Sequence, residues 1–219
     1  MFLAGAGSGA LLAKRLPTGA SGGKTESRPI PALAQRQVAV HEAAHAVVSA
    51  AVRPHAAVLS AEVNVETGED SGYGWVRHEP VLRPETKDEL LADVVVDLSG
   101  MSADELINGA ATDGNAHDLK NASESVAAIC GMNGLCGRLA YRETLGTEEV
   151  ESCLRRLKSR ADRLVQANAG LIMELSETLM EIPVMGGKRT MTGDGFRAFL
   201  MDRHVTTETE LGVAPENCP

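Results

Sequence analysis

The segment HEAAH at residues 41–45 combines two histidines and a glutamate at a spacing that suits metal chemistry. An α-helix turns about once every 3.6 residues, so the imidazoles of His41 and His45 project from one face and can meet a single tetrahedral ion. Zinc lowers the pKa of a bound water to about 7, and Glu42 can take the proton of that water and pass it to a leaving amine. The segment therefore predicts a hydrolytic zinc site with His41 and His45 as ligands and Glu42 as general base.

Two histidines can also lie one turn apart on a helix by chance, so the residues around the motif matter. The flanking positions are apolar: Val38, Val40, Val47 and Val48. In such surroundings two histidines and a glutamate are costly to bury unless a charge satisfies them. The flanks therefore favour the metal site.

A catalytic zinc needs a third protein ligand and leaves its fourth position to water. The longer pattern HExxHxxGxxH is absent, because Val48 and Ala51 stand where it has glycine and histidine. Several later residues carry a suitable donor atom: Asp118, His117, Asp113, Glu105 and Glu124. Residue chemistry does not choose among them, and Asp118 also suits the first turn of a helix for its charge alone. The remaining histidines are more typical of surface or supporting positions than of ligands: His55, His78, His117 and His204.

The elements that must position these residues are mainly helical. A run rich in helix formers follows Pro31, a favourable first residue, and continues until Arg53-Pro54 stops it. This run predicts a long helix that carries HEAAH. Alternating residues over 58–66, a turn-rich stretch and then YGWVR predict a two-stranded hairpin or part of a small sheet.

The next segments predict two helices near the middle of the chain. Thr86 and Glu89 form a capping box for a helix through ELLADVVVDL, which Gly100 should interrupt or end. MSADELIN predicts a further helical turn or two. Asn115 is a plausible N-cap for the helix AHDLKNASESVAAIC, which contains Asp118.

The last third of the chain predicts one long amphipathic helix over 148–181, with a break near Gly170, and a short helix over 193–200. Aromatic residues make up 3% of the 219 residues, while small and aliphatic residues are plentiful, which favours helix-on-helix packing. We therefore expect one working domain with a mainly α fold and a small β-hairpin or short sheet. The expected division is a flexible N-terminal arm over 1–28, a folded domain over 29–205 and a flexible C-terminal tail over 206–219.

Composition also excludes some partners. A formal net charge of −9 argues against a nucleic-acid surface. The opening apolar stretch is too short and too rich in glycine to span a membrane. Two glycine-rich segments, GAGSGA at 5–10 and GKT at 23–25, follow no predicted strand and are interpreted as low-complexity linker rather than nucleotide loops. The four cysteines lack metal-site spacing, so we expect buried, unpaired side chains and a cytoplasmic location.

Three segments resemble the protease domain of the FtsH-type membrane AAA+ zinc proteases: HEAAHAVV, DLSGMSADELINGAATDGNAHDLKNAS and GMNGLCGRLAY. The resemblance runs from about Val38 to Leu200. In that family an HEAGH helix is followed by a GG-x-AAE segment and by a loop of GA-x-x-D-L type whose aspartate is the third zinc ligand. Asp118, with Leu119 after it, falls on that aspartate, so the resemblance implies that Asp118 binds zinc.

The departures from the family pattern concern both the motif and the rest of the chain. Ala44 replaces a glycine, and Ser99-Gly100-Met101 and the residues after it depart mildly from GG-x-AAE. The chain contains neither an AAA+ module nor a membrane span, so we expect hydrolysis that is ATP-independent in itself, with a separate ATPase as a candidate partner. Peptides or unfolded proteins are then the expected substrates, and the hairpin, where the resemblance places the family's substrate strand, could bind them along its edge.

The alternative function is a non-proteolytic, zinc-stabilised binding or assembly module derived from such a peptidase. Glu42 favours the enzyme, because a purely structural zinc site has no use for it. The family's protease domains form hexameric rings, so a homo-oligomer is also expected. The apolar positions of the long C-terminal helical region fit either a core or a subunit contact: Leu154, Leu157, Leu164, Leu171 and Leu175.

Overall fold

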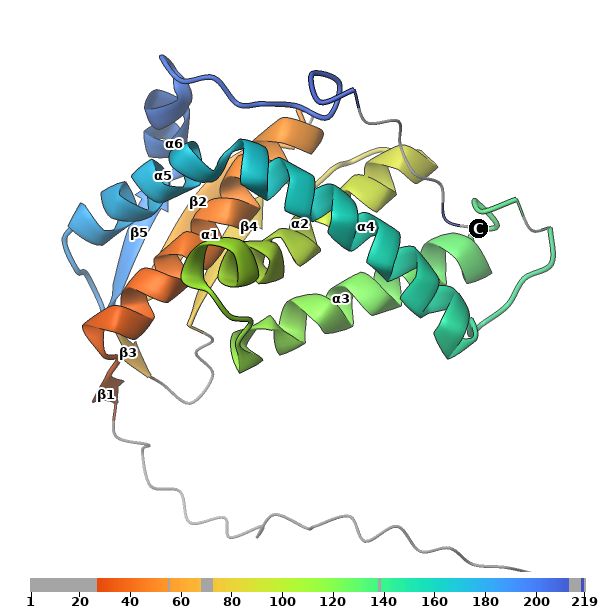
Figure 1. Ribbon diagram of the computed structural model, residues 1–219, viewed down its shortest axis with the longest axis horizontal. Coiled ribbons are helices and arrows are strands. Elements are labelled where there is room, and N and C mark those ends of the chain that lie inside the picture. The colour runs from red at the N-terminus through yellow and green to blue at the C-terminus, as the bar shows by residue number, and fades with distance from the viewer. Residues whose placement is uncertain (1–26, 55, 68–72, 138, 213–217, 219) are drawn as a thin grey trace, which may run out of the picture.

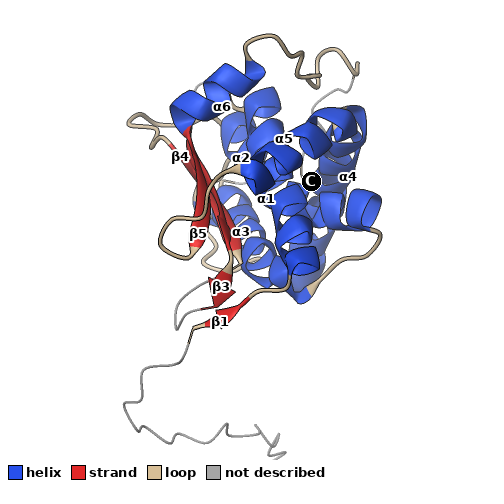
Figure 2. Cartoon of the chain, turned by 90° about the vertical axis from the view of Figure 1, so that its left-hand side faces the viewer, coloured by secondary structure: helices blue, strands red, loops and turns tan. Residues whose placement is uncertain are grey.

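The computed structural model describes residues 27–54, 56–67, 73–137, 139–212 and 218. Most of the expected N-terminal arm, with both of its glycine-rich segments, lies outside these residues, as does His55. The described chain is mainly helical with a small antiparallel sheet along one side (Figures 1 and 2), which confirms the predicted fold class. Within the described ranges, every helix is too short or too polar to cross a bilayer.

Helix α1 (Ala32–Val52) lies at the centre of the fold and contacts α2, α5 and strand β2. It begins after Pro31 and ends at Arg53, as its sequence predicts. Its second half is buried nearly all round, with several alanines and valines that are completely inaccessible: Ala39, Ala43, Ala44, Ala46, Val47 and Val48. Such small side chains let neighbouring elements approach the α1 backbone closely, and the HEAAH segment lies in this buried half.

The sheet has the strand order β4-β2-β5, and both neighbouring pairs are antiparallel. Strands β2 (Val58–Asn64) and β4 (Gly74–His78) are the predicted hairpin. Strand β5 (Lys188–Thr192) was not predicted, because KRTMT lacks a clear apolar alternation. Pairing with β2, more than 120 residues earlier in the chain, determines this strand. A separate two-stranded pair joins β1 (Arg28–Pro29) to β3 (Glu66–Thr67).

Helix α2 (Lys87–Ala103) begins with the predicted capping box. The backbone N–H of Glu89 donates to the Thr86 hydroxyl at 3.3 Å, and the Thr86 N–H donates to the Glu89 carboxylate at 2.8 Å. The prediction that Gly100 interrupts or ends this helix is wrong, because α2 passes through Gly100 and continues into a π-helical turn, Asp104–Asn108. The helix needs glycine at this position because His41 and His45 of α1 fill the space where a side chain would lie.

Helix α3 (Ala116–Ala127) follows a 3-10 turn, Asp113–Asn115, and leads into a π-helical turn, Ala128–Met132. Asn115 occupies the predicted N-cap position, but its backbone is already helical and its side chain makes no capping hydrogen bond. The Asn115 amide is buried instead and donates to the Asp104 carboxylate at 3.1 Å and to the Thr112 carbonyl at 2.9 Å. A tertiary hydrogen bond thus replaces the expected local cap.

The predicted long helix is two helices, α4 (Thr147–Ala167) and α5 (Ala169–Glu181), and the break predicted near Gly170 lies at Asn168. The predicted final helix, α6 (Gly193–Leu200), is confirmed. Leu157, Leu164 and Leu175 are completely buried within the chain. These leucines therefore belong to the core, and they no longer argue for a subunit contact.

The segment after α6 makes specific contacts with the helices. The Arg160 guanidinium of α4, 4% exposed, binds both oxygens of the Glu208 carboxylate at 2.7 and 2.8 Å. The Asn168 amide exchanges hydrogen bonds with the backbone of Thr206. The prediction of a flexible tail over 206–219 did not include these contacts. They depend on two buried polar side chains, Arg160 and Asn168, which lie 48 and 38 residues before their partners in the sequence.

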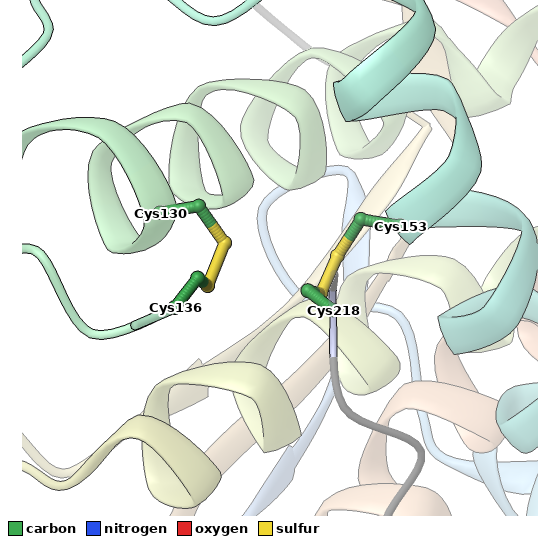
Figure 3. Close-up of a disulfide and its surroundings, with 4 residues drawn as sticks. All are labelled: Cys130, Cys136, Cys153 and Cys218. Atoms are coloured by element: carbon green, nitrogen blue, oxygen red, sulfur yellow. A yellow bond between two sulfur atoms is a disulfide. The ribbon is translucent and has the colours of Figure 1, made fainter. Parts of the chain in front are cut away.

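All four cysteines are paired in disulfides, so the prediction of unpaired thiols is wrong (Figure 3). Cys130 binds Cys136 just after α3, and Cys153 of α4 binds Cys218 near the C-terminus. Spacing alone gave no sign of either bond, because each depends on where the fold places the second cysteine. The cytoplasmic expectation, which rested on reduced cysteines, loses that support.

The two disulfides should differ in their effect on stability. Replacing Cys153 and Cys218 by alanine should lower the free energy of unfolding by about 4 kcal/mol, and replacing Cys130 and Cys136 by about 2 kcal/mol, since a longer closed loop restricts the unfolded chain more. The sequence separations are 65 and 6 residues. Urea denaturation without reductant measures both changes. If a thiol reductant left the midpoint of the unsubstituted protein unchanged, the pairing would be contradicted.

Candidate metal centre

Three side chains from two distant parts of the sequence meet at one point. His41 and His45 come from α1, and Asp118 comes from the first turn of α3. The Nε2 atoms of the two histidines lie 3.0 Å apart, and the Asp118 Oδ2 atom lies 3.1 Å from the first and 3.4 Å from the second. A tetrahedral zinc ion with bonds of about 2.0–2.1 Å separates its ligand atoms by about 3.3 Å. The three atoms therefore have the spacing that such an ion needs.

The hydrogen bonds at the far side of each imidazole show where the protons lie. His45 Nδ1 donates to the Val96 carbonyl at 2.8 Å, since a carbonyl can only accept. His41 Nδ1 donates to the Asp104 carboxylate at 3.3 Å. When both imidazoles are neutral, each Nε2 atom carries a lone pair, and the two lone pairs point toward each other beside the Asp118 carboxylate. A cation between these three atoms relieves the repulsion among them. The donor set, two imidazoles and one carboxylate, suits zinc with one position left open.

The surrounding carboxylates make this point strongly attractive to positive charge. Burial disfavours a charged His41, yet hydrogen bonds with Asp104 and Asp118 and the charge of Glu42 raise its pKa to about 10. Burial likewise opposes ionisation of Asp118, but its bonds with the two histidines hold its pKa far below the usual range. A divalent cation would take the place that these groups otherwise offer to a proton.

Asp104 holds His41 in place and was missed by the sequence analysis. Its carboxylate is 3% exposed and accepts hydrogen bonds from Asn108, Thr112 and Asn115 as well as His41. Carboxylates in this position fix the tautomer and the direction of a metal-binding imidazole. The sequence held one indication that Asp104 lies near the histidines: it follows Gly100 by four residues, which places both on the same face of a helix.

Gly100 explains why α2 continues where its sequence suggested an end. A Cβ atom at this position would overlap the His41 ring and would lie 2.6 Å from His45 Nε2. The absent side chain leaves the space that both imidazoles occupy. Glycine in a helix interior is about 1 kcal/mol less favourable than alanine. At position 100 it is nevertheless required, because α2 passes His41 and His45 there.

Glu42 lies beside the three converging atoms and is 4% exposed. Its Oε2 atom is buried and has no hydrogen-bond partner among the described residues. Burial raises the pKa of Glu42 to about 7, which the positive charges of His45 and His41 partly offset. A Cβ atom on Gly74 of β4 would lie 2.7 Å from Glu42 Oε1, so the bare glycine backbone makes room for this carboxylate. Glu42 thus has a free oxygen where a proton acceptor would be needed.

The other candidates for the third ligand do not reach the two histidines. Glu105 binds Lys158 at 2.7 Å, and Glu124 pairs with Lys120 on an exposed face. The His117 side chain is 79% exposed, and Asp113 is also exposed. Among the described residues, the one group of three metal-binding side chains is His41, His45 and Asp118.

A cavity of about 760 Å³ opens over these residues. Its walls come from the segment around Pro31, from β4, from α2 and from the start of α3. Strand β4 is at one edge of its sheet and lines the cavity from Gly74 to Val76, so its free edge runs past the candidate metal centre. An extended chain that paired with this edge would cross the site.

Comparison with known proteins agrees with this geometry. Residues 28–192 match the sequence model of peptidase family M41. The ATP-dependent zinc metalloprotease FtsH 2 of Symbiobacterium thermophilum is 28% identical over 192 residues, which cover 83% of this chain and 32% of that protein. FtsH 1 of Salinibacter ruber is 29% identical over 69% of this chain and 25% of its own length. FtsH of Methylococcus capsulatus is 27% identical over 87% and 31%. The chain spans about a third or less of the length of these curated relatives.

Replacing Gly100 by alanine should abolish metal binding without breaking α2. Alanine favours a helix by about 1 kcal/mol over glycine, but the added methyl group displaces both imidazoles from their common point. Metal content after dialysis, measured by elemental analysis, should fall at least about tenfold.

The matched control for this change is Gly170→Ala in α5, where a Cβ meets nothing within 4 Å among the described residues. This variant should keep its metal. Normal metal content in Gly100→Ala would show that the histidines do not meet where the structure places them.

Proposed function

Because the chain belongs to peptidase family M41, we propose that it is a zinc-dependent endopeptidase that hydrolyses peptide bonds of peptides or unfolded proteins. The observation that carries this proposal is the convergence of His41 Nε2, His45 Nε2 and Asp118 Oδ2 beside the buried, unpartnered Glu42. The relatives are named zinc metalloproteases, which supports zinc as the metal.

In this proposal His41, His45 and Asp118 hold the zinc ion and Glu42 is the catalytic base. When bound, zinc supplies a Lewis acid that activates water and polarises the substrate carbonyl. Glu42 accepts the proton of the attacking water on its free oxygen and delivers it to the nitrogen of the leaving amine. Asp104 and the Val96 carbonyl keep the two imidazoles turned toward the metal.

Hydrolysis by these groups needs no nucleotide, so we propose that peptide cleavage by this chain is ATP-independent. The relatives are named ATP-dependent, and the chain matches about a third or less of their length. A separate ATPase that would deliver folded substrates is also proposed as a partner, because the relatives are named ATP-dependent. Self-association also remains a proposal, with light scattering across a concentration series as its test.

The alternative is a zinc-stabilised binding or assembly module without proteolysis. A structural zinc site closes all four positions with protein ligands, whereas only three side chains converge in the described part of this chain. The open position and the free Glu42 oxygen favour the enzyme.

Asp118→Asn should lose zinc while the protein stays folded. The change keeps the shape of the side chain but removes the charge of an oxygen ligand, so metal content should fall about tenfold or more. His117→Ala, which alters the exposed neighbour, is the control and should keep its zinc. The opposite result, with zinc retained in Asp118→Asn and lost in His117→Ala, would contradict the ligand assignment.

Glu42→Gln should retain zinc but cleave unfolded casein about 10² to 10⁴ times more slowly, the range for loss of a positioned general base. A chelator should stop cleavage by the unsubstituted protein. Glu177→Gln, at an exposed site on α5, is the matched control and should cleave normally. Full activity in zinc-loaded Glu42→Gln would exclude the mechanism. No cleavage by the zinc-loaded unsubstituted protein would favour the binding module.

A further inference from the structure

Asp93 and Asp97 of α2, and Asp104 at the start of the π-helical turn that follows it, lie at helical spacing along the face that carries Gly100. Two of them are paired. Asp93 binds the Arg53 guanidinium at 2.6 Å, and Asp104 binds His41. Asp97 has neither a hydrogen bond nor an ion pair within the part of the chain that the structure describes. It is half-buried and lines the cavity beside the metal centre.

The described wall of the cavity offers Asp97 no ion-pair partner. None of its described lining residues is lysine or arginine. His78, which also lines it, is neutral at physiological pH, because burial and the charges of Arg53 and His45 lower its pKa to about 4. The nearby Arg53 is already engaged by Asp93. The charges of His45 and Arg53 lower the pKa of Asp97 from a distance, but neither side chain forms an ion pair with it among the described residues. A direct cationic partner for Asp97 must therefore come from outside this set of residues.

Five carboxylates are among the described residues that line the cavity: Glu42, Asp97, Asp104, Asp113 and Asp118. Three of them have a task at the candidate metal centre, which leaves Asp97 and the exposed Asp113. A half-buried carboxylate without a partner is unfavourable. Burial raises the pKa of Asp97 to about 7, with the charges of Asp118 and Asp93 adding to the rise and those of His45 and Arg53 opposing it. A ligand that brought a positive charge to Asp97 would relieve this cost.

We propose that Asp97 is a specificity-determining residue whose carboxylate binds the lysine or arginine side chain of a substrate residue that flanks the scissile bond. The inference rests on the proposed peptidase function. A substrate along the β4 edge has its scissile bond at the metal, and Asp97 lies within reach of the same cavity. A long basic side chain can cross that space and form a charge-assisted hydrogen bond with the carboxylate.

The first test compares matched peptides that carry lysine, norleucine or glutamate at each position around a cleavage site, with products identified by mass spectrometry. The unsubstituted protein should cleave the best lysine peptide about tenfold faster than its norleucine counterpart, as expected for a charge-assisted bond. In Asp97→Asn this ratio should approach one. In Asp97→Lys the preference should change to glutamate.

The control is Asp113→Asn, which removes the same charge from the exposed part of the cavity wall and should change the lysine-to-norleucine ratio less than about twofold. An equal loss of preference in both asparagine variants would assign the effect to the overall charge of the cavity and overturn the role of Asp97. An unchanged ratio in a folded Asp97→Asn protein would also overturn it.

A second measurement does not depend on turnover. Binding of the lysine and norleucine peptides to zinc-loaded Glu42→Gln protein, followed by fluorescence anisotropy, should show the same ratio of dissociation constants and the same loss in a Glu42→Gln/Asp97→Asn double variant. If no peptide is cleaved but this Asp97-dependent binding persists, the proposed peptidase function fails and the basic-residue subsite stands. If peptides are cleaved but binding does not depend on Asp97, the subsite fails alone.

Discussion

The close approach of α1 and α2 is the constraint on which the site depends. The histidines of α1 fit only because α2 has a glycine at position 100, where any side chain would overlap them. Small residues on both helices are completely buried, among them Ala44 on α1 and Ser99 on α2, and the Ser99 hydroxyl lies 3.3 Å from His45 Nδ1. Once the helices are this close, the Val96 carbonyl and the Asp104 carboxylate lie where the imidazole Nδ1 atoms can donate to them. Packing thus sets the direction of both histidines.

Electrostatics then decides what the site can hold. The fold gathers Glu42, Asp104 and Asp118 around two imidazoles in a largely buried place, where unpaired negative charge is costly. The amides of Asn108 and Asn115 and the hydroxyl of Thr112 stabilise Asp104 as an anion. No comparable set of donors reaches Glu42 Oε2 among the described residues. One carboxylate is therefore held as a fixed charge, and the other keeps a free oxygen for proton transfer.

The part of the chain beyond the site holds α3 in position. Asp118 is 77 residues from His41 in the sequence, and its distance to the histidines depends on the packing of α3 against α2 and α4. The Cys130–Cys136 disulfide follows α3 directly, and Cys153–Cys218 attaches the C-terminal segment to α4 (Figure 3). The Arg160–Glu208 ion pair joins the same two parts of the chain. These links act on α4 and on the turn after α3, and α4 packs against α3, the helix that carries Asp118.

The sequence by itself determined the elements whose signals are local. The Pro31 and Arg53-Pro54 limits of α1, the Thr86–Glu89 capping box and the alternation in β2 each act within a few residues, so the pattern predicts them. The HEAAH spacing likewise predicted two imidazoles on one helical face. For the third ligand, residue chemistry left five candidates open, and the resemblance to a known family indicated Asp118.

Tertiary structure alone decided the features that depend on distant partners. Strand β5 exists because β2 offers an edge, the Asn115 side chain donates to Asp104 instead of capping α3, and the cysteines pair because the fold brings them together. Gly100 shows the reason most clearly. Local propensity marks it as a helix end, but the helix continues because the histidines of another helix fill the space where its side chain would be. A contact between α1 and α2 therefore overrides a preference of about 1 kcal/mol that the sequence alone expresses.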